Sequence, residues 1–246
     1  MRLESVTVDA VDPVALAEWW AGALGWVVVD VDESEVVLAE LIEADGGHRY
    51  PELLFLPVAE PEAGQERIHL DLNSHSLVEQ QAIVDRLVAM GAVPADVGQA
   101  ADALFVVLAD PEGNNFCVLD PRTQYAHLGS LAGFTLAAHD ASALKELWAA
   151  ATGWDVARDD GDYVVLTSPD AVAPMEIITR PTMPDDDRKD RIHLDVAPGP
   201  DEDQAGVVAS LETLGARRVD IGQGDVGWVV LTDPEGNEFC VLTPRP

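Results

Sequence analysis

The stretches RIHLDL at 67–72 and RIHLDV at 191–196 decide the fold, because they show that the chain carries one segment twice. A second pair, DPEGNNFCVLDP at 110–121 and DPEGNEFCVLTP at 233–244, repeats at a spacing of 123 residues, against 124 for the first pair. Two ordered matches at one period indicate an internal duplication. The sequence therefore predicts two copies of a single domain.

The boundary between the copies falls in the segment TQYAHLGS, which has neither helical nor strand periodicity. We predict a first domain over 1–122, a linker over 123–130 and a second domain over 131–246. Each repeat is long enough to bury a hydrophobic core of its own.

The first repeat contains the same order of predicted elements twice. Its first helix begins after Asp12 and Pro13, which supply an N-cap and a first-turn proline, and ends at Gly25. Its second helix spans 76–90. The side chains expected to point inward from that helix are Leu77, Val84, Leu87 and Val88. The predicted strands lie at 4–9, 26–31, 35–39, 52–58, 67–72, 93–97, 104–108 and 115–119.

The second repeat follows the same order, with a strand at 133–138, a helix at 141–151 and a second unit that opens at RIHLDV. The DPEG segments have Asp, Pro and Gly at the positions that a β-turn favours, so they lead into the closing strands. The sequence therefore predicts an α+β fold with two β-α-β-β-β units in each repeat.

Charge and hydropathy exclude several classes of protein. The chain has 45 acidic and 14 basic residues, and its net charge of −31 predicts repulsion from phosphate backbones and anionic lipids. No apolar run approaches the length of a membrane span, and the first residues lack the apolar core of a secretory signal. We expect a cytoplasmic protein that binds neither nucleic acid nor membranes. Cys117 and Cys240 hold matching positions and predict reduced thiols.

Two units per domain, with H-x-D opening the second and DPEGN-x-F closing it, resemble the vicinal oxygen chelate superfamily. This superfamily includes glyoxalase-like, bleomycin-resistance and extradiol-dioxygenase proteins, and the resemblance covers nearly the whole chain twice. It implies tandem glyoxalase-like domains, in each of which two units curl into a half-open barrel with a ligand in the concave cleft. It also implies that such domains pair about a pseudo-two-fold axis, within a monomer or in a homodimer.

The resemblance further implies a divalent metal in the enzymes of the group, with ligands on the first, fifth and last strands. The first-strand position falls on Ser5 and Gly133, which are not metal ligands. The fifth-strand position holds His69 and His193, and Cys117 and Cys240 stand where a last-strand Glu is expected.

A fourth-strand ligand, which some members add, is expected at Glu52 and Glu176, each 17 residues before its His. Because too few good ligands remain, we predict no metal cofactor. The alternative is an improvised site, whose ligands would be Glu52, His69 and Cys117, with Glu176, His193 and Cys240 in the second copy.

Side chains alternate along a strand, so Arg67, His69 and Asp71 share one face of the fifth strand. The apolar face of that strand is expected to pack against the helices, which leaves the polar row in the cleft. A His beside an Asp suits ligand binding or general-base catalysis, and the alternative is a polar trio that only fixes the strands. The predicted catalytic residues are His69, Asp71, His193 and Asp195. The predicted ligand-binding residues are Arg67, Arg191, Phe105, Trp228, Cys117 and Cys240.

These observations predict a protein that binds a small organic molecule, with an aromatic ligand suited to Trp228 and its counterpart Phe105. The alternative function is a metal-dependent lyase, isomerase or dioxygenase of the same superfamily. A third hypothesis, an interaction scaffold, leaves the duplicated polar row without a purpose.

Overall fold

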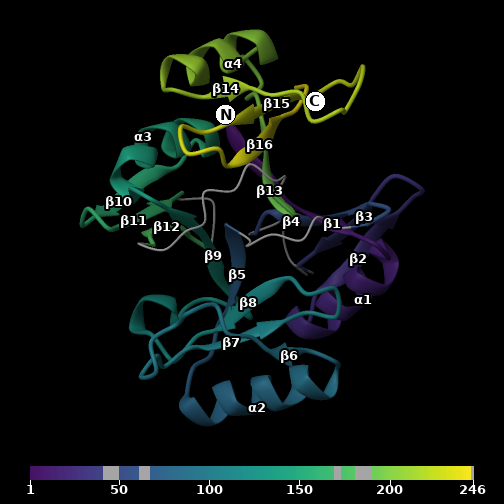
Figure 1. The fold of residues 1–246 in the computed structure, drawn as a ribbon, viewed down its shortest axis with the longest axis vertical. Helices are drawn as coiled ribbons and strands as arrows, with labels where there is room; N and C mark the ends of the chain where they lie inside the picture. The colour runs from purple at the N-terminus through teal and green to yellow at the C-terminus, as the bar shows by residue number, and fades with distance from the viewer. Residues whose placement is uncertain (41–49, 61–66, 169–172, 181–189, 245–246) are drawn as a thin grey trace.

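The computed structural model describes residues 1–40, 50–60, 67–168, 173–180 and 190–244. In this part of the chain, four α-helices cover two eight-stranded mixed sheets (Figure 1). None of the helices in the described ranges combines the length and the hydropathy needed to span a membrane.

Sheet A joins the first unit of the first repeat to the last unit of the second. Its strand order is β14-β15-β16-β13-β1-β4-β3-β2, and antiparallel pairing of β1 with β13 forms the junction. The strands are β1 (Arg2–Ala10), β2 (Val27–Val31), β3 (Val36–Ala39), β4 (Glu52–Pro57), β13 (Ile192–Ala197), β14 (Arg217–Arg218), β15 (Val229–Thr232) and β16 (Glu238–Val241).

Sheet B is built in the same way from the two middle units. Its order is β10-β11-β12-β9-β5-β8-β7-β6, with antiparallel pairing of β5 and β9 at the junction. The strands are β5 (Ile68–Leu72), β6 (Val93–Pro94), β7 (Val106–Ala109), β8 (Asn115–Val118), β9 (Leu131–Ala138), β10 (Asp155–Asp159), β11 (Tyr163–Thr167) and β12 (Met175–Thr179).

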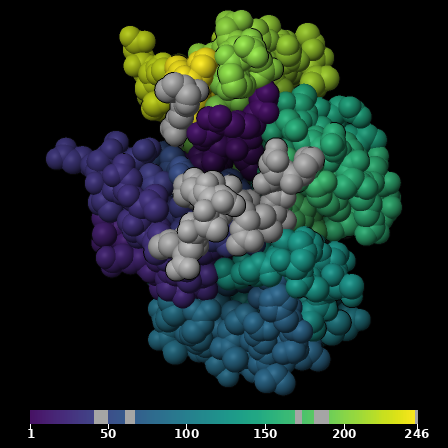
Figure 2. All heavy atoms as spheres, turned by 180° about the vertical axis from the view of Figure 1, so that it is seen from behind, coloured from purple at the N-terminus to yellow at the C-terminus, as the bar shows by residue number. Residues whose placement is uncertain are grey.

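The two sheets confirm the α+β fold with paired β-α-β-β-β units, and they add which units pair. Each sheet takes one unit from each repeat, so the repeats are interlaced rather than set side by side. In Figure 1 the purple strands of the first unit continue through β13 into the yellow strands of the last one. Figure 2 shows from behind that the purple N-terminal residues also pack against the C-terminal unit, where the Met1 amino group binds Glu202 at 2.6 Å.

The helices are α1 (Pro13–Leu24), α2 (Leu77–Ala89), α3 (Ala141–Thr152) and α4 (Gln204–Thr213). The carboxylate of Asp12 accepts a hydrogen bond from the backbone N–H of Ala15, which confirms the predicted N-cap of α1. Gly25 ends that helix in the left-handed conformation, with a φ of 72°, which glycine adopts without steric cost.

Helix α2 corrects the predicted apolar stripe. Leu87 is fully buried, but Leu77 and Val88 are 61% and 43% exposed. Gln80 points inward instead, because its amide donates hydrogen bonds to the carbonyls of Leu104 and Val118. A polar side chain with two backbone partners can therefore hold an interior position.

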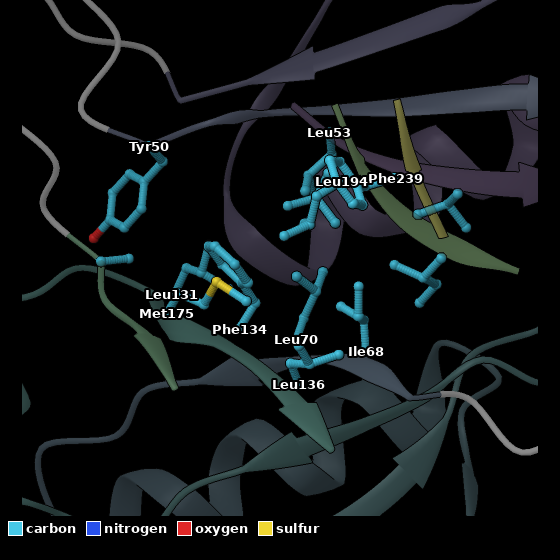
Figure 3. Packing of buried hydrophobic residues seen from close by; sticks show 14 of the residues in the cluster. Tyr50, Leu53, Ile68, Leu70, Leu131, Phe134, Leu136, Met175, Leu194 and Phe239 are labelled. Carbon is cyan, nitrogen blue, oxygen red and sulfur yellow. The ribbon is translucent and has the colours of Figure 1, made fainter. Parts of the chain in front are cut away.

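The core lies between the sheets as well as under the helices. Ile68 and Leu70 on β5 point toward Leu194 on β13 and Phe239 on β16 (Figure 3). Ile68 and Leu70 thus form a buried apolar face on β5, as predicted. This face packs on the opposite sheet, whereas the sequence analysis expected it to pack against helices. The opposite face of each central strand carries the polar side chains and is therefore available for a functional site.

Each of the two DPEGN turns forms hydrogen bonds that connect one sheet to the other. The Glu112 carboxylate in the first turn accepts hydrogen bonds from the backbone N–H groups of Val11 and Asp12, at 2.8 and 2.9 Å. Glu235 in the second turn binds the N–H groups of His139 and Asp140 in the same way. A side chain in each turn thus covers the start of a helix that belongs to the other sheet.

Candidate functional site

Four polar side chains meet at the centre of sheet A. His193 and Asp195 alternate along β13, and Thr7 on β1 is the register partner of His193. Cys240 on β16 is the register partner of Asp195. Because register partners project from the same face of a sheet, the pairing brings residues from both repeats into one row.

Asp195 organises this row. Its Oδ1 lies 3.5 Å from Nε2 of His193, and its Oδ2 accepts hydrogen bonds from Thr7 at 2.6 Å and Ser5 at 3.1 Å. Nδ1 of His193 is buried and has no hydrogen-bond partner among the described residues. Asp195 therefore holds the imidazole through Nε2, and no described residue pairs with Nδ1 on the other side of the ring.

A cavity of about 380 Å³ opens beside this row, and we call it cleft A. Its polar floor contains His193, Asp195 and Cys240, and Trp228 forms part of its wall with 42% of its surface exposed. Its remaining lining residues are Asp9, Ser34, Glu35, Leu54, Leu56, Ile221, Gln223, Val230, Glu238, Phe239 and Leu242. Its volume lies within the range of small-molecule sites.

The equivalent row on sheet B contains His69, Asp71, Thr135 and Cys117, and we call its position site B. Nε2 of His69 lies 3.5 Å from Oδ1 of Asp71, and Thr135 donates a 2.6 Å hydrogen bond to Oδ2. Burial opposes protonation of His69, but the charge of Asp71, and hydrogen bonds to Asp71 and Cys117, raise its pKa well above the ordinary value. Burial also raises the pKa of the Cys117 thiol.

Site B has a further buried carboxyl group. Glu176 on β12 is 5% exposed, and its Oε1 accepts hydrogen bonds from the hydroxyls of Tyr125 and, at 2.6 Å, Tyr163. Burial, and then the charge of Asp71, raise the pKa of Glu176 to about 7. Near neutral pH this group is able both to accept and to donate a proton.

The two glutamates that the sequence equates are not equivalent. Glu176 is the register partner of Thr135, whereas the partner of the corresponding Thr7 is Leu54. Glu52 lies two residues earlier on β4, beside Ser5. The sequence analysis equated Glu52 with Glu176 because each lies 17 residues before its His. The residue that is equivalent to Glu176 is Leu54, which lies only 15 residues before His69, so the assumption of equal spacing was wrong.

The predicted metal set also requires correction. Glu52 belongs to sheet A with His193 and Cys240, whereas His69 and Cys117 belong to sheet B, so the set assembled along one repeat does not form. Among the residues that the structure describes, the groups that form are His193, Asp195, Cys240 and their counterparts His69, Asp71, Cys117. In each group the ligand atoms lie within 4.8 Å of one another. Imidazole, carboxylate and thiolate suit a tetrahedral divalent cation with one open position.

Other predicted ligand-binding residues fall in two places. Phe105 packs against the cluster of buried residues that contains Cys117, as its counterpart Trp228 lies beside Cys240 in cleft A. Arg67 donates to the carbonyl of Glu235 at 2.6 Å, and Arg191 donates to the carbonyl of Glu112 at 3.1 Å. Each of these guanidinium groups therefore binds the DPEGN turn of the other repeat.

Four functional candidates escaped the sequence analysis. Thr7 and Thr135 lie two residues beyond the expected first-strand ligand positions, and only the pairing with β13 and β5 reveals them. Tyr125 belongs to the predicted linker, in the 3-10 helix η1 (Thr123–Tyr125), and Tyr163 lies at the start of β11. In the sequence, the signal for Tyr125 was an aromatic residue within a segment predicted to be a linker.

Comparison with known proteins matches the glyoxalase-like domain model at residues 5–119 and 133–242. No curated protein sequence matches the chain. Glyoxalase I from Zea mays has a similar structure, with a TM-score of 0.65, 12% identity, and coverage of 98% of this chain and 92% of that one. A putative dioxygenase from Bacillus subtilis is similar as well, with a TM-score of 0.63, 16% identity, and coverage of 100% and 86%. At these identities the likeness shows a shared fold.

Proposed function

Because the chain belongs to the glyoxalase-like family through both of its repeats, we propose that it binds a small organic molecule in cleft A. The observation that carries this proposal is the cavity of about 380 Å³ with an indole in its wall and an imidazole–carboxylate pair on its floor. The apolar wall removes ligand surface from water, and the few polar groups orient the ligand.

Binding is expected to change the fluorescence of Trp228 and to depend on His193. A set of aromatic and aliphatic metabolites, titrated while fluorescence and thermal unfolding are recorded, should contain at least one stabilising ligand. His193→Ala is expected to lower the affinity for that ligand about tenfold, which corresponds to the loss of one hydrogen bond. Trp228→Phe should abolish the fluorescence signal but keep the thermal shift.

The matched control is His127→Ala, because His127 is exposed on the linker. An unchanged affinity in this variant links any loss in His193→Ala to cleft A. The proposal fails if no compound of the set stabilises the protein, or if both variants bind equally well.

A second candidate function, a metal-dependent enzyme, is favoured by the two His–Asp–Cys groups. His193, Asp195 and Cys240 would hold a divalent cation, which would supply a Lewis acid that polarises an oxygen of the ligand. The raised pKa of Cys117 opposes formation of its thiolate in site B until a cation displaces the proton.

Zinc is the appropriate probe for these groups, since it accepts nitrogen, oxygen and sulfur ligands. We expect elemental analysis after dialysis against zinc to find two ions per chain, and one ion in either Cys117→Ser or Cys240→Ser. Zinc that stays at the level of the dialysis buffer would exclude this function.

A further inference from the structure

The two sites share a floor but differ on the neighbouring strand. In both of them a His, an Asp, a Thr and a Cys occupy matching positions, as the strand registers show. One strand farther, the partner of Thr7 is Leu54, and the partner of Thr135 is Glu176. The duplicated scaffold therefore places an apolar side chain and a carboxyl group at the same point of two related sites.

The next strand carries the difference further. Val37 on β3 pairs with Leu54, and Val165 on β11 pairs with Glu176, so these valines are equivalent. Two residues before them stand Glu35, which lines cleft A, and Tyr163, which donates a hydrogen bond to Glu176. Site B thus holds its carboxyl group in place with a phenol that cleft A lacks at this position.

The Glu176 carboxyl group offers one oxygen to a ligand. Both tyrosine hydroxyls bind Oε1, and no described residue donates a hydrogen bond to Oε2. A carboxylate oxygen accepts hydrogen bonds, so a donor group of a ligand would form a favourable hydrogen bond with Oε2. The corresponding atoms in cleft A are the methyl groups of Leu54, which favour an apolar ligand group.

We propose that the two sites bind different ligands: site B takes a small molecule whose hydroxyl or amine group donates to Glu176, and cleft A takes one with an apolar group there. This inference rests on the proposed ligand-binding function, and it assigns a ligand class to each site. One chain would then hold two distinct molecules in an interlaced pair of sites.

The test uses 4-fluorobenzyl alcohol and 4-fluorotoluene, which share a ring and differ by one hydroxyl group. Trp228 reports on cleft A, and Phe105→Trp in a Trp228→Phe background moves the reporter to site B. We expect the site B reporter to bind the alcohol about tenfold more tightly than the toluene, and the cleft A reporter to show no such preference.

Reciprocal substitutions complete the test. Glu176→Leu should remove the preference for the alcohol in site B, because it removes the acceptor oxygen. Leu54→Glu should create the preference in cleft A. Equal preference in both sites, or a preference that survives Glu176→Leu, overturns this inference alone. Absence of binding by both probes at both sites overturns the inference together with the proposed function.

Discussion

Replacement of Asp110 by alanine is expected to lower the free energy of unfolding by about 3 kcal/mol, because it leaves several buried donors without an acceptor. Oδ1 accepts the backbone N–H groups of Glu112 and Asn114, at 2.9 and 3.0 Å. Oδ2 accepts the Asn114 amide at 2.8 Å and the Trp20 indole N–H at 3.0 Å. Trp20 and Asn114 are almost completely buried, so water does not replace the lost acceptor.

Urea unfolding at pH 7 measures this effect. Asp233→Ala should show a similar loss, because Asp233 makes the equivalent bonds to Trp148, Asn237 and Glu235 in the second turn. Asp102→Ala, at an exposed position, is the control and should stay within about 0.5 kcal/mol of the wild type. A loss of the same size in all three variants would refute the role assigned to these carboxylates.

Replacement of Glu176 by glutamine is expected to remove a pH-dependent loss of stability. A carboxyl group whose pKa rises from 4.5 to about 7 on folding binds its proton more tightly in the folded state. Its contribution therefore falls as the pH rises through this interval, by about 2–3 kcal/mol between pH 5 and pH 8. The wild type should lose this amount relative to Glu176→Gln, whose amide oxygen still accepts from Tyr125 and Tyr163.

The measurement is the difference in unfolding free energy between the two proteins, at several pH values and without added metal. Taking the difference cancels the other acidic groups that titrate in this range. A carbon-13 NMR titration of the Glu176 carboxyl group gives its pKa independently. A midpoint below 5, or a difference that stays constant with pH, would contradict the assignment.

The sequence was sufficient for the elements and for the floor of each site. Caps such as Asp12 and Gly25 depend on local chemistry, and the alternation around His69 and His193 places their side chains without knowledge of the tertiary fold. Short-range patterns of this kind made the positions of the helices and most strands predictable.

The partners of each site were not predictable, because strand pairing is a long-range property. The sequence analysis grouped Glu52 with His69, but β4 lies in sheet A and β5 in sheet B. The equivalence of Leu54 and Glu176 also depends on strand register. It cannot be read from the sequence, because the segment that leads to the following His is two residues shorter in the first repeat. Identical repeats do not specify which copies of their units will meet.

The pairing of β1 with β13 has a consequence for biosynthesis. Arg2 lies opposite Ala197, so the N-terminal strands leave the ribosome long before their partner has been translated. The middle units, which are adjacent in the chain, are able to assemble first and to offer a surface on which the outer units later close. Contacts between such distant residues form slowly, and until then the edge of β1 that pairs with β13 remains open.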